Sequence, residues 1–245
     1  MNLPFYLLFI LLGFLSCNGE ETSPNIQTNG TLTLIDSSAL TTNSVTYQPT
    51  DIQAYYPIFF IGKPSDTIIL GKEPISTHLL NHKRLIGKPC NYYPDSNDMS
   101  IEVDTSFKLS NKVFYKHYSE SNQTLLTDSI LSYLSYPIFI RNLSDSVLFI
   151  GNFNCIENLV RQAQNRNNVW VDIEVPIDYQ CSTGQGSIYL ESGEILIAKL
   201  NRYNADFKTN CRLKYQKKGK IIYSNTFIDF VDSRLFLEPK IPSVY

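Results

Sequence analysis

The chain has 245 residues and a formal net charge of −2, which gives no overall positive field to attract nucleic acid or an anionic membrane surface. Nucleic acid is therefore excluded as an expected partner. Its 16 Tyr and 14 Phe, against only two Met, suit half-buried pleated strands better than helices. The length accommodates one large or two small domains with a core that needs no disulfides for stability.

A continuous apolar run opens the chain, from Leu3 to Phe14. At about a dozen residues it is too short to span a bilayer and has the length of a secretory signal core. The sequence therefore predicts a signal peptide over residues 1–16 and export of the remainder.

The run ends in Phe14-Leu-Ser-Cys17, and this ending resembles the bacterial lipobox, whose cysteine is acylated and becomes the new N-terminus. The next residues, which include Glu20 and Glu21, resemble the acidic signal that sends lipoproteins of Bacteroidota to the outer surface. These resemblances imply an outer-membrane lipoprotein exposed at the cell surface, with the membrane as a partner through lipid on Cys17. The alternative is an ordinary cleaved signal in which the two glutamates are linker charges.

Residues 17–45 are rich in Asn, Thr, Ser and Gly and poor in apolar residues, which predicts a flexible tether. Two units are expected to follow, a small β-rich unit over residues 46–132 and a larger domain over 133–237, with a C-terminal tail at 238–245. The first unit forms a sheet of its own or adds strands to the second.

One strand-turn-strand pattern occurs twice, beginning at Tyr56 and at Tyr136. Each copy reads Y-P-I-F, a polar turn with Ser-Asp, a second apolar run and a glycine. The pattern predicts a β-hairpin that was duplicated. Between the copies, two further strands are expected at Ser100–Thr105 and Lys112–Lys116, with a reversal at 109–111 and a connector over 128–135.

The second unit has turn signals at regular intervals, which include Asn165-Arg-Asn-Asn168 and the lysine-rich turn Lys217-Lys-Gly219. These signals predict seven or eight short strands. This spacing favours an immunoglobulin-like antiparallel β-sandwich. Residues 157–164 are expected to form a strand, although their apolar positions also fit a helix face. In the clearest strand Cys211, Leu213 and Tyr215 alternate with polar residues and are expected to face inward, and Trp170 is expected in the core.

Several motifs of this second unit resemble those of a set of uncharacterised Bacteroidota lipoproteins. The motifs are W-x-x-I-E at Trp170–Glu174, L-x-x-G-E at Leu190–Glu194 and Y-N-A-D-F-K-T-N-C-R-L at Tyr203–Leu213. The resemblance covers about the last hundred residues and the signal. It implies membrane anchoring and a C-terminal sandwich, and it implies no activity.

Four cysteines remain if Cys17 is lipidated: Cys90, Cys155, Cys181 and Cys211. In an exported protein they are candidates for two disulfides, with three connectivities that sequence cannot rank. The alternative is that they are buried free thiols. Their spacings match no zinc pattern.

Catalytic chemistry has few candidates in this sequence. His78 and His82 would share a face on a helix, but no third metal ligand lies near them, and no G-x-S-x-G elbow marks a nucleophile. Asp172 and Glu174 lie two apart on an expected strand and would point to one face, as in a glycosidase. That spacing is more typical of a solvated strand face, so no catalytic residue, metal site or cofactor is predicted.

Three function classes follow from these features. The leading hypothesis is a cell-surface lipoprotein that binds or scaffolds without catalysis, with a protein or glycan as its ligand. The second is a periplasm-facing component of envelope structure or assembly, and the third is a hydrolase with an unrecognised site. Fold alone does not discriminate among them, because β-sandwiches host all three.

Overall fold

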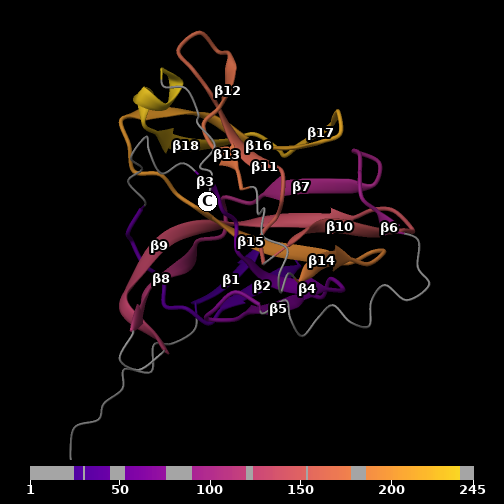
Figure 1. The fold of residues 1–245 in the computed structure, drawn as a ribbon, viewed down its shortest axis with the longest axis horizontal. Coiled ribbons are helices and arrows are strands. Elements are labelled where there is room, and N and C mark those ends of the chain that lie inside the picture. Colours follow the sequence, from indigo (N-terminus) through magenta and orange to yellow (C-terminus); the bar gives the residue numbers. More distant parts are fainter. Residues whose placement is uncertain are drawn as a thin grey trace, which may run out of the picture.

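The computed structural model describes residues 25–29, 31–44, 53–75, 90–119, 124–152, 154–177 and 186–237. Within these ranges the chain consists of strands with one short 3-10 helix, η2 (Ser233–Phe236), which confirms the mainly β class (Figure 1). The strands are β1 (Asn25–Asn29), β2 (Leu32–Asp36), β3 (Gln53–Ala54), β4 (Ile58–Gly62), β5 (Thr67–Leu70), β6 (Cys90–Asn91), β7 (Met99–Val103), β8 (Leu109–Ser119), β9 (Thr124–Asn142), β10 (Val147–Asn152), β11 (Leu159–Gln164), β12 (Trp170–Asp172), β13 (Val175–Pro176), β14 (Ser187–Leu190), β15 (Ile195–Asn201), β16 (Phe207–Lys217), β17 (Lys220–Tyr223) and β18 (Phe227–Val231).

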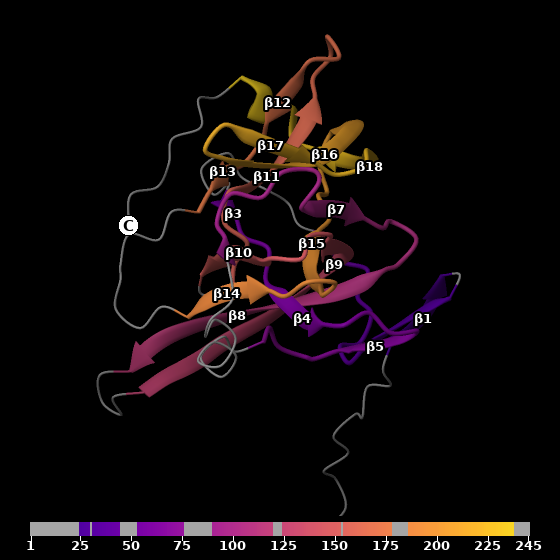
Figure 2. The same ribbon diagram turned by 90° about the vertical axis from the view of Figure 1, so that its right-hand side faces the viewer.

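Two five-stranded sheets dominate the molecule. The central sheet has the order β4-β15-β9-β7, with β8 also paired to β9, and the outer sheet has the order β12-β11-β16-β17, with β18 also paired to β16. A three-stranded sheet, β1-β2-β5, lies on the other side of the central sheet, so that the three form successive layers (Figure 2). The arrangement is consistent with the predicted β-sandwich, and its immunoglobulin-like character stays a prediction.

Alternation along β15 places a hydrophobic core on each face of the central sheet. Leu196, Ala198 and Leu200 belong to the larger core, which packs against the outer sheet. Ile195 and Ile197 belong to a second core with residues of β2 and β5. Because both faces of β15 are covered, it is buried from end to end except at its last residue.

The two copies of the repeated pattern do not form hairpins, so that prediction is wrong. In the first copy β4 belongs to the central sheet and β5 to the three-stranded sheet; in the second, β9 belongs to the central sheet and β10 pairs with β14 and β6. Each copy therefore crosses between sheets. The reason is burial: strand β10 is buried over five successive residues and is covered on both faces, which a two-stranded hairpin cannot provide.

The first strands of both copies flank β15, and their residues occupy matching positions. Ile61 of β4 and Ile140 of β9 both lie opposite Leu196. Ile58 and Ile138 both lie opposite Ala198, and the extra residue of the first copy, Phe59, is absorbed by a register shift in β4. The duplication of an ancestral unit stays a prediction.

The tether prediction is wrong for residues 25–29 and 31–44, since these residues form β1, β2 and the segment that follows. Strand β2 pairs with β1 on one side and runs parallel to β5 on the other. Leu34 and Asp36 are fully buried. Their partners come from distant parts of the chain. The local sequence is polar and predicts no ordered structure, but this long-range packing stabilises the strands.

Strand β9 is longer than predicted and joins the two expected units. The region predicted as a connector, 128–135, lies inside β9, which pairs with β7 through its C-terminal part and with β8 through the rest. Strands β7 and β8 therefore lie end to end along one edge of β9, and the predicted reversal at 109–111 is part of β8. Because β3, β4, β6 and β7 also pair with strands after residue 132, the first half adds strands to sheets of the second.

Most of the sequence-based predictions for the outer sheet are confirmed, and one is wrong. Residues 159–164 form strand β11, so the helical alternative is wrong, and Cys211, Leu213 and Tyr215 of β16 face inward as predicted. Trp170 is half-buried on the opposite, outer face, so its predicted core position is wrong.

Among the described residues no helix has the length and apolarity that would be needed to cross a membrane.

Candidate functional site

The turn between β11 and β12 is held rigid by one side chain. The Oδ1 atom of Asn165 accepts hydrogen bonds from the backbone N–H of Asn167, at 2.9 Å, and of Val169, at 3.1 Å. Asn168 has a φ of 60°, in the left-handed region that asparagine tolerates better than most residues. The sequence predicted this turn, and its internal hydrogen bonds fix the positions from which Arg166 and Asn167 project.

Two hollows lie beside this turn and meet at Asn165, Arg166 and Phe207. We call them together the turn cleft. The first, of about 320 Å³, is lined also by residues of η2, and the second, of about 470 Å³, by Lys208, Asn210 and Ile228 among others. Volumes of this order match small-ligand sites.

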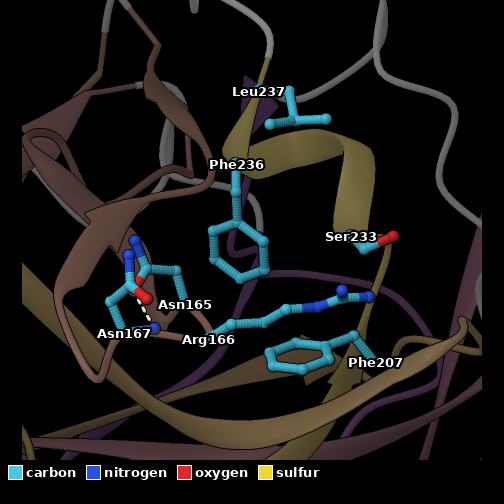
Figure 3. A pocket seen from close by; sticks show the side chains of 7 residues that line it. All are labelled: Asn165, Arg166, Asn167, Phe207, Ser233, Phe236 and Leu237. Atoms are coloured by element: carbon cyan, nitrogen blue, oxygen red, sulfur yellow. Dashed lines mark hydrogen bonds between the residues drawn. The ribbon is translucent and has the colours of Figure 1, made fainter.

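Aromatic rings form the apolar part of the first hollow (Figure 3). Phe207 and Phe236 meet edge to face, with ring centroids 5.6 Å apart. Figure 3 shows the side chain of Arg166 extending past these two rings toward Ser233. The first hollow therefore combines two aromatic rings with a guanidinium group.

Two carboxylates position η2 at the edge of this hollow. Asp206 accepts hydrogen bonds from Ser233, from its N–H at 2.9 Å and from its hydroxyl at 2.7 Å, and these bonds lower the pKa of Asp206. Asp232 caps η2 by accepting from the N–H of Arg234 and also pairs with that guanidinium. Both carboxylates are occupied by protein donors, and neither lines the cleft.

The lining of the cleft is rich in hydrogen-bonding groups. Its polar groups are amides, hydroxyls, the Arg166 guanidinium and the Lys208 ammonium. None of the described residues that line either hollow is a histidine, a cysteine or a carboxylic acid. Amides supply both donors and acceptors, as a hydroxyl-rich ligand requires.

The strongest ionisable cluster lies elsewhere, sealed between the central and outer sheets. Arg161 of β11 is fully buried and pairs with Asp229 of β18 at 2.9 Å and with Glu174 at 3.5 Å. Tyr203 donates its hydroxyl to Glu174 at 2.6 Å, and Tyr56 donates to the same carboxylate. The Arg161 guanidinium also lies 3.8 Å from the centre of the Tyr203 ring.

The pKa values in this cluster follow from burial and from its charges. Burial alone would lower the pKa of Arg161, but Tyr203, Glu174 and Asp229 raise it well above its ordinary value. Burial raises the pKa of Asp229, against the opposing effect of Arg161. None of these residues lines the turn cleft, so we interpret the cluster as a link between the two sheets.

Asp172 and Glu174 do not share a face, so their expected arrangement is wrong. Strand β12 ends at Asp172, which lies on the outer face and contacts Gln162 and Lys214. Beyond the strand end the chain turns inward, and the Glu174 carboxylate accepts from the backbone N–H of Arg161 at 2.9 Å. The two-residue period fails because the strand stops between them.

Cys90, Cys155 and Cys211 are free thiols in the structure, and Cys155 and Cys211 are buried. This agrees with the free-thiol alternative for those two residues. Cys181 lies outside the described residues, as do several other predicted features: Cys17, Glu20, Glu21, His78, His82, the signal peptide and the C-terminal tail.

The lysine-rich turn predicted after β16 is confirmed. Lys217 pairs with Lys220 across it, and Lys218 and Gly219 both have positive φ, as a two-residue hairpin turn requires. Lys217 contacts the ring of Phe149 at 4.3 Å and Glu157 at 3.8 Å. This lysine therefore ties the turn to β10 instead of extending from it.

The sequence identified 165–168 only as a turn and gave no sign of the cleft. The other walls of the cleft come from Phe207, Ile228 and Phe236, which are distant from the turn in the sequence. The local excess of asparagine and arginine was the one available signal.

Comparison with known proteins adds no constraint on the site, since no family model, no curated protein and no solved structure matches the chain. Among the described residues no group of three or more His, Cys, Asp or Glu side chains is arranged to hold a metal ion.

Proposed function

We propose that this protein is a membrane-anchored lipoprotein of the cell surface that binds a glycan without catalysis, and that the turn cleft is its binding site. The observation that carries the proposal is the lining of the cleft, where aromatic rings, amides and two cations meet and no described carboxylate intrudes. Anchoring through Cys17 and the acidic residues after it would place the cleft outside the cell.

Two further features support a binding role. The buried ionisable residues are engaged with one another between the sheets and line neither hollow of the cleft. The cleft itself is built on a turn whose backbone is fixed by Asn165, so a ligand meets a largely preformed surface.

Binding is tested by affinity electrophoresis of the purified protein through gels that contain neutral or acidic polysaccharides. Retardation is expected for at least one polysaccharide, and Asn167→Ala in the turn is expected to weaken it. Asn204→Ala is the matched control, because Asn204 is also exposed but lies outside the lining of the cleft. If no polysaccharide retards the protein, glycan binding is refuted and protein partners become the alternative.

Location is tested separately, by protease treatment of intact cells. Loss of the mature protein, while a known periplasmic protein survives, is the expected result. Survival would refute surface export by Glu20 and Glu21 and would favour the periplasm-facing alternative.

A further inference from the structure

The outer face of strand β16 carries a row of polar side chains that we call the β16 strip. Its members alternate with the buried residues of the strand and are exposed or half-buried: Lys208, Asn210, Arg212, Lys214 and Gln216. Successive members are about 7 Å apart, and Lys208 and Arg212 are about 14 Å apart along the strand. The strip begins in the turn cleft, since Lys208 and Asn210 also line its second hollow.

Arg212 is held in place at the middle of the strip. Its guanidinium lies 4.2 Å from the centre of the Trp170 ring and 3.7 Å from that of the Tyr223 ring. It therefore contacts aromatic rings from β12 and from β17. Its Nε donates to Gln162 at 2.8 Å. An arginine fixed in this way loses little conformational entropy when an anion binds to its outer nitrogens.

Neighbouring acids cancel only part of the positive charge of the turn cleft and the strip. Lys214 is paired with Asp172, but Arg166, Lys208 and Arg212 have no carboxylate partner among the described residues. The turn cleft and the adjoining strip therefore carry three cations without a carboxylate partner, on a chain whose net charge is −2. Such a local positive patch selects for an anionic ligand.

The spacing of these cations favours a sparsely charged polymer. Duplex DNA carries one charge per about 1.7 Å of its axis, far denser than one cation per about 14 Å of strand. The amides between the cations, on Gln164, Asn168 and Asn210, supply donors and acceptors for hydroxyl groups. A polysaccharide with intermittent acidic groups fits both features.

We infer that the turn cleft and the β16 strip form one continuous track for a linear acidic polysaccharide, whose carboxylate or sulfate groups are bound by Arg166, Lys208 and Arg212. This inference rests on the proposed glycan binding and names its ligand class. It also gives a role to the solvent-facing stack of Trp170, Arg212 and Tyr223, which the packing of the core does not require.

The test is affinity electrophoresis of the purified protein with four probes: polygalacturonate, dextran sulfate, uncharged dextran and duplex DNA. Retardation by a polyacid, weakened between 50 and 200 mM salt, is expected, and dextran should give none. The carboxylate and sulfate probes distinguish the two sources of charge. The double variant Arg166→Gln/Lys208→Gln is expected to bind about tenfold more weakly. This corresponds to a loss of about 1.4 kcal/mol in binding free energy for two exposed ionic contacts.

Lys72→Gln is the matched control, because it removes an exposed lysine from the loop after β5 and should not change binding. Equal retardation by dextran and the polyacids would keep the glycan proposal and overturn the acidic track. Retardation by DNA alone, or unchanged binding in the double variant, would also overturn the track. No retardation by any polysaccharide would refute both proposals.

Discussion

The Nζ atom of Lys199 lies 3.0 Å from both carboxylate oxygens of Asp36, and both side chains are completely buried. Lys199 also donates to the carbonyl of Ser110 at 2.7 Å, and Asp36 accepts from the backbone N–H of Ser110 at 3.0 Å. The pair joins strand β15 of the central sheet to β2 of the three-stranded sheet. Burial lowers the pKa of Lys199, and the Asp36 carboxylate opposes this effect.

Removing one partner of this ion pair should destabilise the protein strongly. Lys199→Met leaves the Asp36 charge buried without a counter-ion, and the expected loss in the free energy of unfolding is about 3–5 kcal/mol. Urea denaturation measures this loss. The double variant Lys199→Met/Asp36→Leu removes both charges and should recover part of the stability, although the buried N–H of Ser110 loses its acceptor. A double variant no more stable than the single one would contradict this account of the pair.

The hydroxyl of Tyr203 should stabilise the buried Arg161 cluster. In Tyr203→Phe the Glu174 carboxylate loses a 2.6 Å hydrogen bond inside the protein, and the expected cost is about 1.5–3 kcal/mol, as for bonds to charged groups. Thermal and urea unfolding measure the cost. Tyr223→Phe on the outer face is the control, expected to change stability by less than about 0.5 kcal/mol. Equal effects of the two variants would argue against a structural role for the cluster.

Gly151 should tolerate no side chain. A Cβ atom there would clash with the carbonyl oxygen of Cys155 and would lie 2.8 Å from the backbone nitrogen of Glu157, and backbone atoms cannot easily move aside. Gly151→Ala is therefore expected to cost about 3 kcal/mol or more in the free energy of unfolding.

The control for this variant is Gly71→Ala, at the matching position of the repeated pattern. A Cβ atom at Gly71 would lie 3.3 Å from the carbonyl oxygen and 4.0 Å from the backbone nitrogen of Glu73, so a change within about 1 kcal/mol is expected. Chemical denaturation of the two variants side by side gives the comparison. Similar losses in both would show that the contact at Gly151 does not explain the need for glycine.

The two buried thiols should make stability depend on pH in the alkaline range. Burial raises the pKa of Cys155 and of Cys211 to about 12, whereas thiols of an unfolded chain titrate near about 8.5. Between these values the folded state holds more protons than the unfolded state. The stabilisation is therefore complete below about pH 8.5 and is lost as pH rises toward 12.

The measurement compares the protein with its double variant Cys155→Ala/Cys211→Ala at about pH 7.5 and pH 10. The stability advantage of the unsubstituted protein should shrink by about 2 kcal/mol per thiol, from 1.36 kcal/mol per pKa unit. Other groups that titrate in this range affect both proteins equally. An advantage that does not change with pH would contradict protonated thiols in the folded state.

The sequence by itself determined the β class, the turn at 165–168, the lysine turn after β16 and the inward face of Cys211, Leu213 and Tyr215. These features depend on residue type and two-residue periodicity, which are local properties. Asn165 and Gly219 are examples, because each residue suits its turn whatever surrounds it.

Only the tertiary structure decided which strands pair and what the polar residues contact. The repeated pattern reads as a hairpin, yet each copy crosses between sheets, because the burial of β10 on both faces depends on strands far along the chain. Trp170 reads as a core residue and instead stacks on Arg212. From the sequence, Asp36 is predicted to belong to a polar tether. In the structure it is buried, and Lys199 provides its counter-ion. Partners so distant in sequence leave no local pattern, so the ion pair and the cleft are visible only in the folded chain.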